Sequence, residues 1–160
     1  MPKSVLLDTN LLVVLVVGLL DPSIIGIHKR TKNYTPDDFL ALRRALDNYQ
    51  ELWITSQSVA ETSNLVRQTN EAQAEQLLTI LSELVSSSKE SNMDSRGIFT
   101  APCVLKLGVT DAGIAKKSKR VTNLLTADLD LYLEVSGKFS NAINFNHIRT
   151  GAWSFNGNIA

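Results

Sequence analysis

The chain has 160 residues, and its sixteen Lys and Arg residues balance sixteen Asp and Glu residues. Apolar residues make up 44% of the sequence, which excludes a chain that is disordered over most of its length. The length fits one domain, so we expect a single domain over residues 1–160. The only cysteine, Cys103, excludes an intrachain disulfide and a zinc site built from several thiolates.

A membrane-spanning segment is not expected. Leu11–Leu20 (LLVVLVVGLL) holds ten uncharged residues between Asp8 and Asp21, whereas a spanning helix needs about 20 apolar residues. A signal peptide is not expected either, because Lys3 is the only basic residue before the run and an acidic residue stands at position 8. We therefore expect a buried core segment in a soluble, cytoplasmic protein with no membrane partner.

The first elements are predicted from apolar runs and capping residues. Ser4–Leu7 is short and apolar, as a buried strand is, and Asp8, Thr9 and Asn10 offer capping groups just before the apolar run. The valines of that run also suit a strand, but the order of strand, polar turn and apolar segment favours a helix.

Strands and helices continue to alternate along the rest of the chain. The first half continues with a loop over Asp21–Tyr34, a helix from Thr35 with Phe39, Leu42, Leu46 and Tyr49 on one face, a strand at Leu52–Thr55, a helix capped by Ser56 or Ser58 and reaching Val66, and a helix over about Glu71–Val85. A loop over Lys89–Ala101 and the unassigned segment Val104–Leu107 follow. The second half has a helix over Ala112–Lys119 capped by Thr110 and Asp111, a strand at Asn123–Thr126, a helix over Leu129–Val135, a strand at Ala142–Phe145 and a loosely structured tail at 150–160. This alternation predicts an α/β fold with a mostly parallel central sheet flanked by helices.

Carboxylates follow several of the predicted strands. Asp8 comes directly after the first strand, Asp128 and Asp130 come after the strand that ends at Thr126, Asp111 starts a helix, and Glu61 lies in the helix after the second strand. In open α/β sheets the carboxyl ends of the strands meet at one edge, where ligands bind. Ionised carboxylates crowded there need a counter-charge, and oxygen ligands without His or Cys partners suit Mg²⁺ or Mn²⁺.

Each of these residues taken singly also has a purely structural explanation. Asp8, Asp111 and Asp128 stand where a helix N-cap is expected, and Glu61 suits a solvated helix surface. The pattern of the whole set, rather than any one member, indicates a metal site.

Ordered motifs add a family resemblance. In chain order they are Val5–Asn10 (VLLDTN), Ile54–Thr55 followed by Val59–Glu61, Leu107–Ala115 (LGVTDAGIA), Leu124–Asp130 (LLTADLD) and the closing segment Ala142–Phe145. Together they resemble the motifs of PIN domains, metal-dependent nucleases with a Rossmann-like three-layer fold. The resemblance covers Val5 to about Ile148, although the stretches 21–34 and 86–101 are longer than in compact bacterial toxins of that family.

The resemblance implies an acidic pocket that binds Mg²⁺ or Mn²⁺ and hydrolyses RNA phosphodiester bonds. Asp8, Glu61, Asp111 and Asp128 would be its catalytic metal ligands, with Asp130 as a fifth contributor. Supporting roles are expected for three further residues: Thr9 and Asn10 would hydrogen-bond the carboxylates or the phosphate, and Thr126 would orient Asp128 or contact water.

The resemblance also implies partners. A PIN-type ribonuclease of this size suggests the toxin of a toxin–antitoxin pair, with an antitoxin protein as partner and a homodimer as a frequent assembly. RNA needs positive charge near the pocket, and the loop residues Lys29, Arg30 and Lys32 supply a candidate RNA-binding cluster.

Other polar features are expected to be structural. The basic run Lys116–Arg120 is a second candidate RNA-binding cluster, but the favoured interpretation is a solvated helix C-terminus, where cations complement the helix dipole. We expect His28 and His147 at the surface and Cys103 as a small buried residue.

Two alternative functions stay open. A phosphatase of the haloacid dehalogenase type also has an Asp after its first strand, but it needs a second Asp two positions on, where this chain has Asn10. A catalytically silent PIN-like domain that binds nucleic acid or acts as a scaffold is the other alternative, and the complete acidic set argues against it.

Overall fold

The computed structural model describes residues 1–149, and a five-stranded, wholly parallel sheet forms its centre. The strand order is β3-β2-β1-β4-β5, with β1 in the middle. The bounds are Ser4–Leu7 for β1, Glu51–Thr55 for β2, Lys89–Ser91 for β3, Asn123–Thr126 for β4 and Ala142–Asn144 for β5. The predicted α/β fold with a parallel sheet is confirmed.

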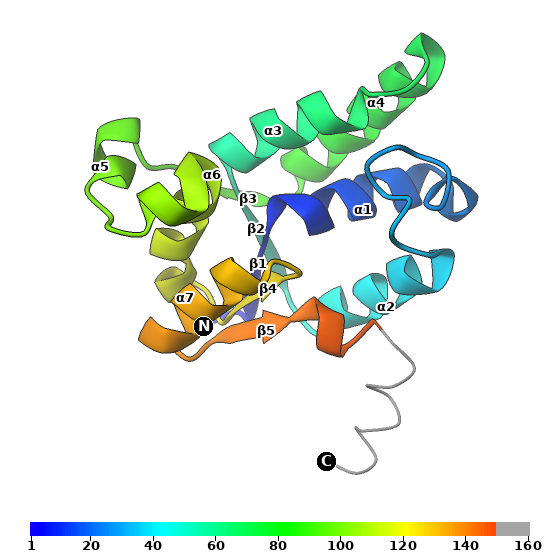
Figure 1. Cartoon of the computed structure of the whole chain (residues 1–160). Coiled ribbons are helices and arrows are strands. Elements are labelled where there is room, and N and C mark those ends of the chain that lie inside the picture. The colour runs from blue at the N-terminus through cyan, green and yellow to red at the C-terminus, as the bar shows by residue number, and fades with distance from the viewer. Residues whose placement is uncertain (150–160) are drawn as a thin grey trace.

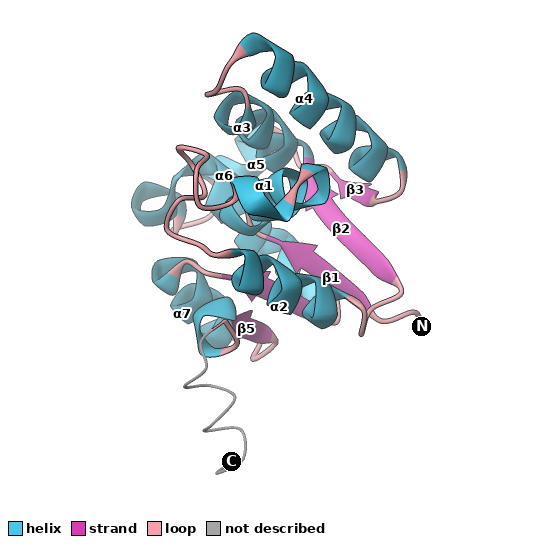
Figure 2. Cartoon of the chain, turned by 90° about the vertical axis from the view of Figure 1, so that its right-hand side faces the viewer, coloured by secondary structure: helices cyan, strands magenta, loops and turns pink. Residues whose placement is uncertain are grey.

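Helices cover both faces of this sheet (Figures 1 and 2). The α-helices in the described part of the chain are α1 (Thr9–Leu20), α2 (Pro36–Leu46), α3 (Ser56–Val66), α4 (Glu71–Ser86), α5 (Ser95–Phe99), α6 (Val104–Lys117) and α7 (Leu129–Lys138). Helix α1 packs against α2, α3 and α4, whereas α6 packs against α5 and α7. None of the helices within residues 1–149 combines the length and apolar character needed to cross a membrane.

The alternation of side chains along β1 divides the core into two clusters. Val5 and Leu7 pack into the cluster that contains α1, and Leu6, on the opposite face, packs into the cluster that contains α6 and α7. All three side chains are at most 1% exposed, because strands of a parallel sheet are covered on both faces.

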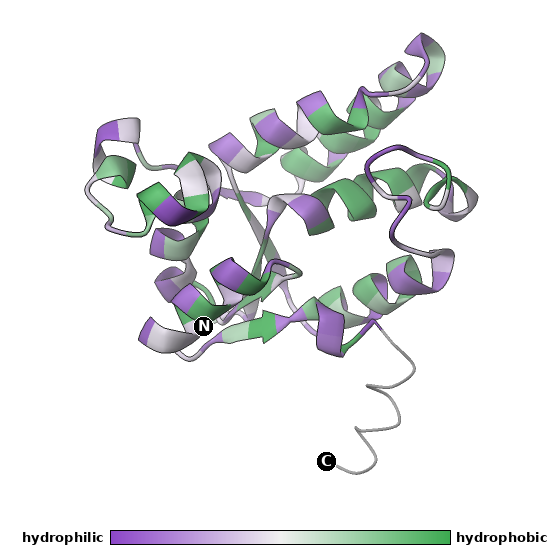
Figure 3. Ribbon diagram, in the orientation of Figure 1, coloured by the Kyte–Doolittle hydropathy of each residue, from purple (hydrophilic) through white to green (hydrophobic). Residues whose placement is uncertain are grey.

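Helix α1 is buried on all sides along most of its length, which explains its lack of a polar face. The residues from Leu11 to Val17 are at most 2% exposed, and Figure 3 shows most of the helix in the hydrophobic colour. The prediction of a helix over this apolar run is therefore confirmed, and the run serves the core of the chain itself. Gly18 allows α2 to approach closely, since a Cβ there would lie 2.1 Å from a ring carbon of Phe39.

The predicted loop over Lys89–Ala101 is wrong in two places. Lys89–Ser91 forms the edge strand β3, which pairs with β2 so that Lys89 lies opposite Trp53. Its first two side chains are exposed and polar, so the strand carries no apolar alternation that would reveal it. Helix α5 follows, capped by Asp94, whose Oδ1 accepts the Gly97 N–H at 2.8 Å.

The predicted start of the helix near Asp111 is also wrong. Helix α6 begins at Val104 and is kinked at Gly108, whose φ of 83° lies in the left-handed region that favours glycine. Thr110 and Asp111 therefore lie in the first turn after the kink and do not precede the helix. Two smaller corrections concern α3, which is capped by Thr55 and by neither Ser56 nor Ser58, and β5, which ends at Asn144.

Candidate metal centre

The predicted acidic residues gather at the carboxyl edge of the sheet. Strands β1 and β4 are parallel neighbours, and Asp8 and Asp128 follow their last residues as the N-caps of α1 and α7. Glu61 lies on α3, which packs against α1, and Asp111 lies on α6, which packs against α3. The parallel topology thus brings four distant parts of the sequence to one place (Figure 1).

Asp8 is the most deeply buried member of the set, with 2% of its surface exposed. Its Oδ1 accepts the Leu11 N–H at 2.8 Å, and its Oδ2 accepts the Ala127 N–H at 2.9 Å and the Thr126 hydroxyl. Burial raises the pKa of the Asp8 carboxyl above 3.8, and these hydrogen bonds oppose the rise. The side chain is therefore held in a fixed position whether or not a cation is bound.

Thr126 connects Asp8 with Asp128. This side chain is fully buried, and its Oγ1 donates to Asp8 and accepts the Asp128 backbone N–H at 3.0 Å. The Asp128 carboxylate in turn accepts the Leu131 N–H at 2.9 Å. Thr126 therefore sets the orientation of one carboxylate and the backbone position of the other.

Asp111 carries the least compensated charge of the cluster. Burial raises the pKa of its carboxyl from 3.8 to about 7, and the charges of three neighbouring carboxylates add to the rise. These neighbours are Asp8, Asp128 and Glu61. Within residues 1–149 the Asp111 carboxylate has no ion pair and accepts no hydrogen bond, so it lacks a counter-charge. The four residues predicted as ligands are close enough to repel one another.

Glu61 is exposed and is oriented from α6. Its Oε2 accepts the hydroxyl of Thr110 at 2.8 Å. Thr110 is in position because of the kink at Gly108, which starts a new helical turn directly beside α3. This contact joins the second and third motifs of the sequence.

Two of the three other predicted site residues are bonded to groups outside this cluster, and the third is exposed. Asp130 is exposed and forms an ion pair with Lys106 at 3.7 Å, and its charge makes no contribution to the pKa of Asp111. Thr9 is buried and shares a 3.0 Å hydrogen bond with Ser58, so it bonds to α3 and not to a carboxylate. Asn10 is exposed.

The donor set suits a hard divalent cation, although its arrangement does not already form a coordination shell. Within residues 1–149, no group of three or more His, Cys, Asp and Glu side chains has the arrangement needed to hold a metal ion. Backbone N–H groups and a hydroxyl already occupy oxygens of Asp8, Asp128 and Glu61. Oxygen ligands without His or Cys partners are nevertheless the kind that Mg²⁺ and Mn²⁺ prefer.

The predicted RNA-binding loop lines a hollow of about 350 Å³ beside α1. Lys29, Arg30 and Lys32 are exposed and line it together with Asn10, two positions after Asp8. The basic side chains of this loop therefore share a hollow with Asn10 in the first turn of α1, and a phosphate backbone binds to such positive charge.

The expectation that His28 lies at the surface is wrong. It is 4% exposed, its Nε2 donates to the Val66 carbonyl at 3.0 Å and its Nδ1 accepts the Arg30 N–H at 3.0 Å. A buried imidazole with both nitrogens bonded fastens the basic loop to the end of α3. His147 is exposed and Cys103 is buried, as expected.

Two residues near the site carried no signal in the sequence. Burial raises the pKa of the Tyr34 hydroxyl, and the nearby charge of Asp8 raises it further. Arg149 lies over the Tyr34 ring at 4.4 Å and pairs with Asp38 at 2.8 Å. Both belong to segments that only the tertiary fold brings beside the carboxylates. The predicted tail at 150–160 lies outside the described residues.

No protein-family model matches the sequence, and no curated protein matches it. The PIN-domain assignment therefore stays a prediction that rests on the ordered motifs.

Proposed function

We propose that the chain is a divalent-metal-dependent endoribonuclease of the PIN-domain type. The observation that carries the proposal is the placement of Asp8 and Asp128 after neighbouring parallel strands, with Asp111 close by. Burial raises the pKa of the Asp111 carboxyl to about 7, and the charges of Asp8, Asp128 and Glu61 add to the rise. Such a site favours a divalent cation, and the basic loop with Lys29, Arg30 and Lys32 favours a polyanion. RNA hydrolysis uses both features.

Each residue of the proposed site has a separate role. Asp8, held by three hydrogen bonds, provides a fixed ligand, and Asp111 becomes a ligand when it loses its proton. Bound Mg²⁺ or Mn²⁺ supplies the Lewis acidity that stabilises charge on a phosphoryl group. Thr126 holds Asp8 and Asp128 in fixed positions relative to each other. Lys29, Arg30 and Lys32 bind the phosphates that flank the scissile bond.

The proposal extends to the biological role. By resemblance to bacterial PIN toxins, we propose a cytoplasmic toxin that is neutralised by an antitoxin protein and forms a homodimer. Expression of the wild-type chain alone should then arrest bacterial growth, whereas an Asp8→Asn variant produced to the same level should not. Equal growth of both strains would contradict the toxin role and leave the nuclease chemistry to be judged in vitro.

The test of the activity is cleavage of a single-stranded oligoribonucleotide in Mn²⁺ or Mg²⁺. Asp8→Asn and Asp111→Asn should each lose at least about 100-fold in rate, because each removes a ligand charge. Asp130→Asn is the matched control and should keep wild-type activity, since its carboxylate pairs with Lys106 outside the cluster.

The outcomes separate the three candidate functions. Full activity of Asp8→Asn and Asp111→Asn would refute the site. Hydrolysis of a small phosphate monoester in preference to RNA would favour the phosphatase alternative. Metal binding without turnover of either substrate would favour the silent domain.

A further inference from the structure

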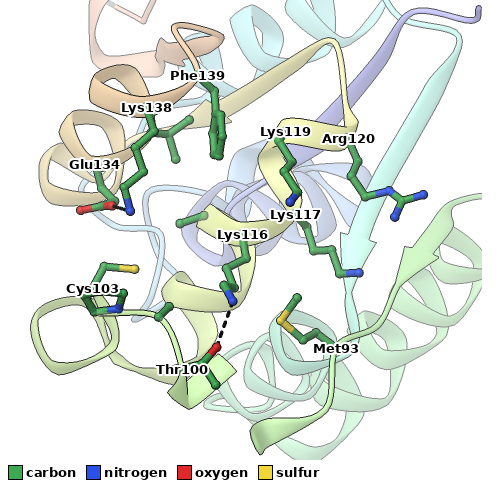
Figure 4. Close-up of a pocket in the computed structure, with 14 residues that line it drawn as sticks. Met93, Thr100, Cys103, Lys116, Lys117, Lys119, Arg120, Glu134, Lys138 and Phe139 are labelled. Atoms are coloured by element: carbon green, nitrogen blue, oxygen red, sulfur yellow. Dashed lines mark hydrogen bonds and ion pairs between the residues drawn. The ribbon is translucent and has the colours of Figure 1, made fainter. Parts of the chain in front are cut away.

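A second cavity lies away from the acidic cluster, between α5, the end of α6 and α7. Its volume is about 340 Å³, which falls in the range of cavities that hold small ligands. It is lined by the segment from Thr100 to Cys103, by the last turn of α6, by the short helix η2 (Ser118–Arg120) and by the last turns of α7 with Phe139 (Figure 4).

The lining carries a strong excess of positive charge. Of the described residues around the cavity, five are basic, namely Lys116, Lys117, Lys119, Arg120 and Lys138, and one, Glu134, is acidic. In a chain without net charge, this concentration of cations is local and unbalanced. Cations gathered in a concave site raise the local concentration of anions.

Not all of these cations are available to a ligand. Lys138 is paired with Glu134 at 2.6 Å, and the Lys116 ammonium donates to the Thr100 hydroxyl at 3.1 Å (Figure 4). Lys117, Lys119 and Arg120 have no ion pair with any carboxylate in residues 1–149. A solvated helix end explains Lys116 and Lys117, which lie in the last turn of α6. It does not explain why the basic cluster continues past the helix to Arg120 and surrounds a cavity.

Apolar side chains also line the cavity. Phe139 remains 39% exposed although it lines the cavity, and Met93 and Val135 also contribute to the wall. An accessible aromatic ring beside cations is the arrangement that binds a nucleobase by stacking and its phosphate by charge. An inorganic anion alone would not be stabilised by contact with these apolar side chains.

We propose that this cavity binds a nucleoside phosphate, with the base stacked on Phe139 and the phosphate on Lys117, Lys119 and Arg120. The nucleotide is either a unit of an RNA chain or a free nucleotide. Asp111 and Lys117 lie on the same helical segment, six residues or about 9 Å apart along its axis. The binding of a free nucleotide does not depend on the proposed nuclease function. The binding of a unit of an RNA chain rests on that function and extends it.

The test is isothermal titration calorimetry of AMP with the full chain in EDTA and no divalent cation. AMP should bind, inorganic phosphate should compete, and the double variant K119A/R120A should weaken binding about tenfold or more through the loss of two charge-assisted contacts. Phe139→Ala should weaken AMP binding several-fold while leaving phosphate binding unchanged. The charge-matched control R44A/R67A, which removes two exposed cations elsewhere, should bind AMP as the wild type does.

A second arm identifies the source of the nucleotide. If K119A/R120A also weakens binding of a short single-stranded RNA in EDTA, the cavity takes a unit of the RNA chain; if only AMP is affected, it takes a free nucleotide. Failure of the wild type to bind AMP, or equal binding by K119A/R120A with a native circular dichroism spectrum, would overturn the proposal. Because no cleavage is measured, an inactive nuclease would leave this result unchanged.

Discussion

At the scale of single residues, Thr126 determines the geometry of the acidic cluster. Thr126→Val keeps the shape of the buried side chain but removes the hydroxyl that donates to Asp8 and accepts from the Asp128 N–H. We expect a loss of about 1–3 kcal/mol in the free energy of unfolding and a 10–100-fold loss in Mn²⁺ affinity. Urea denaturation and metal titration measure the two effects.

The control for this variant is Thr126→Ser, which restores the hydroxyl. Recovery of metal affinity in the serine variant would identify Thr126 as a positioning residue. A threonine needed only for packing would instead leave the valine variant with wild-type metal affinity and weaken the serine variant, which lacks the methyl group.

A second prediction at this scale concerns pH. The Asp111 pKa is about 7 in the folded chain and 3.8 ordinarily. At pH values between these two, the folded state therefore holds a proton that the unfolded state has released. In EDTA, the free energy of unfolding should therefore fall as the pH rises from about 5 to about 8. For this partly exposed carboxyl the fall is about 1–2 kcal/mol after solvent screening.

The variant Asp111→Asn isolates this effect. The asparagine carries no titrating proton, so its free energy of unfolding should fall less over the same interval. A residual slope is expected from Asp8, whose pKa is raised in the same direction. The same pH dependence in both proteins, measured by urea denaturation, would show that Asp111 is not charge-crowded.

At the scale of elements, the close approach of α1 and α2 depends on Gly18. Gly18→Ala would place a Cβ 2.1 Å from the ring of Phe39, and the fully buried helix has no room to move away. We expect a loss of about 1–3 kcal/mol in the free energy of unfolding, as for other overpacked cores. Gly26→Ala is the matched control, since nothing lies within 4 Å of its Cβ position. Equal stability of the two variants would mean that the helices do not pack as described.

The elements also show which structural features can be predicted from sequence. The strands β1 and β4 and the helix α1 are apolar enough to be predicted with their caps, because each is buried by the fold. The edge strand β3 carries polar side chains and is held by backbone pairing, which leaves no pattern in the sequence. The kink at Gly108 places Asp111 inside a helix, although the same residues resemble a helix start.

At the scale of the whole molecule, the parallel sheet explains why part of the candidate site was predictable. Topology alone carries Asp8 and Asp128 to one edge, since both follow neighbouring parallel strands. The directions of Thr9 and Asp130 depend on individual partners, Ser58 and Lys106, which no spacing reveals. The basic cavity depends on α5, α6 and α7 meeting in space. In the sequence its cations form only the run Lys116–Arg120, for which a helix end is the favoured interpretation and RNA binding the alternative.

The central claim is that the crowded carboxylates bind a divalent cation, and the most direct measurement is a thermal unfolding titration with Mn²⁺ at about pH 8. Mn²⁺ should raise the melting temperature of the wild type in proportion to the logarithm of its concentration, as ligand linkage requires. Asp111→Asn and Asp8→Asn should lose most of this rise, and Asp130→Asn should keep it. A melting temperature that Mn²⁺ leaves unchanged, or an equal rise in all four proteins, would contradict the claim.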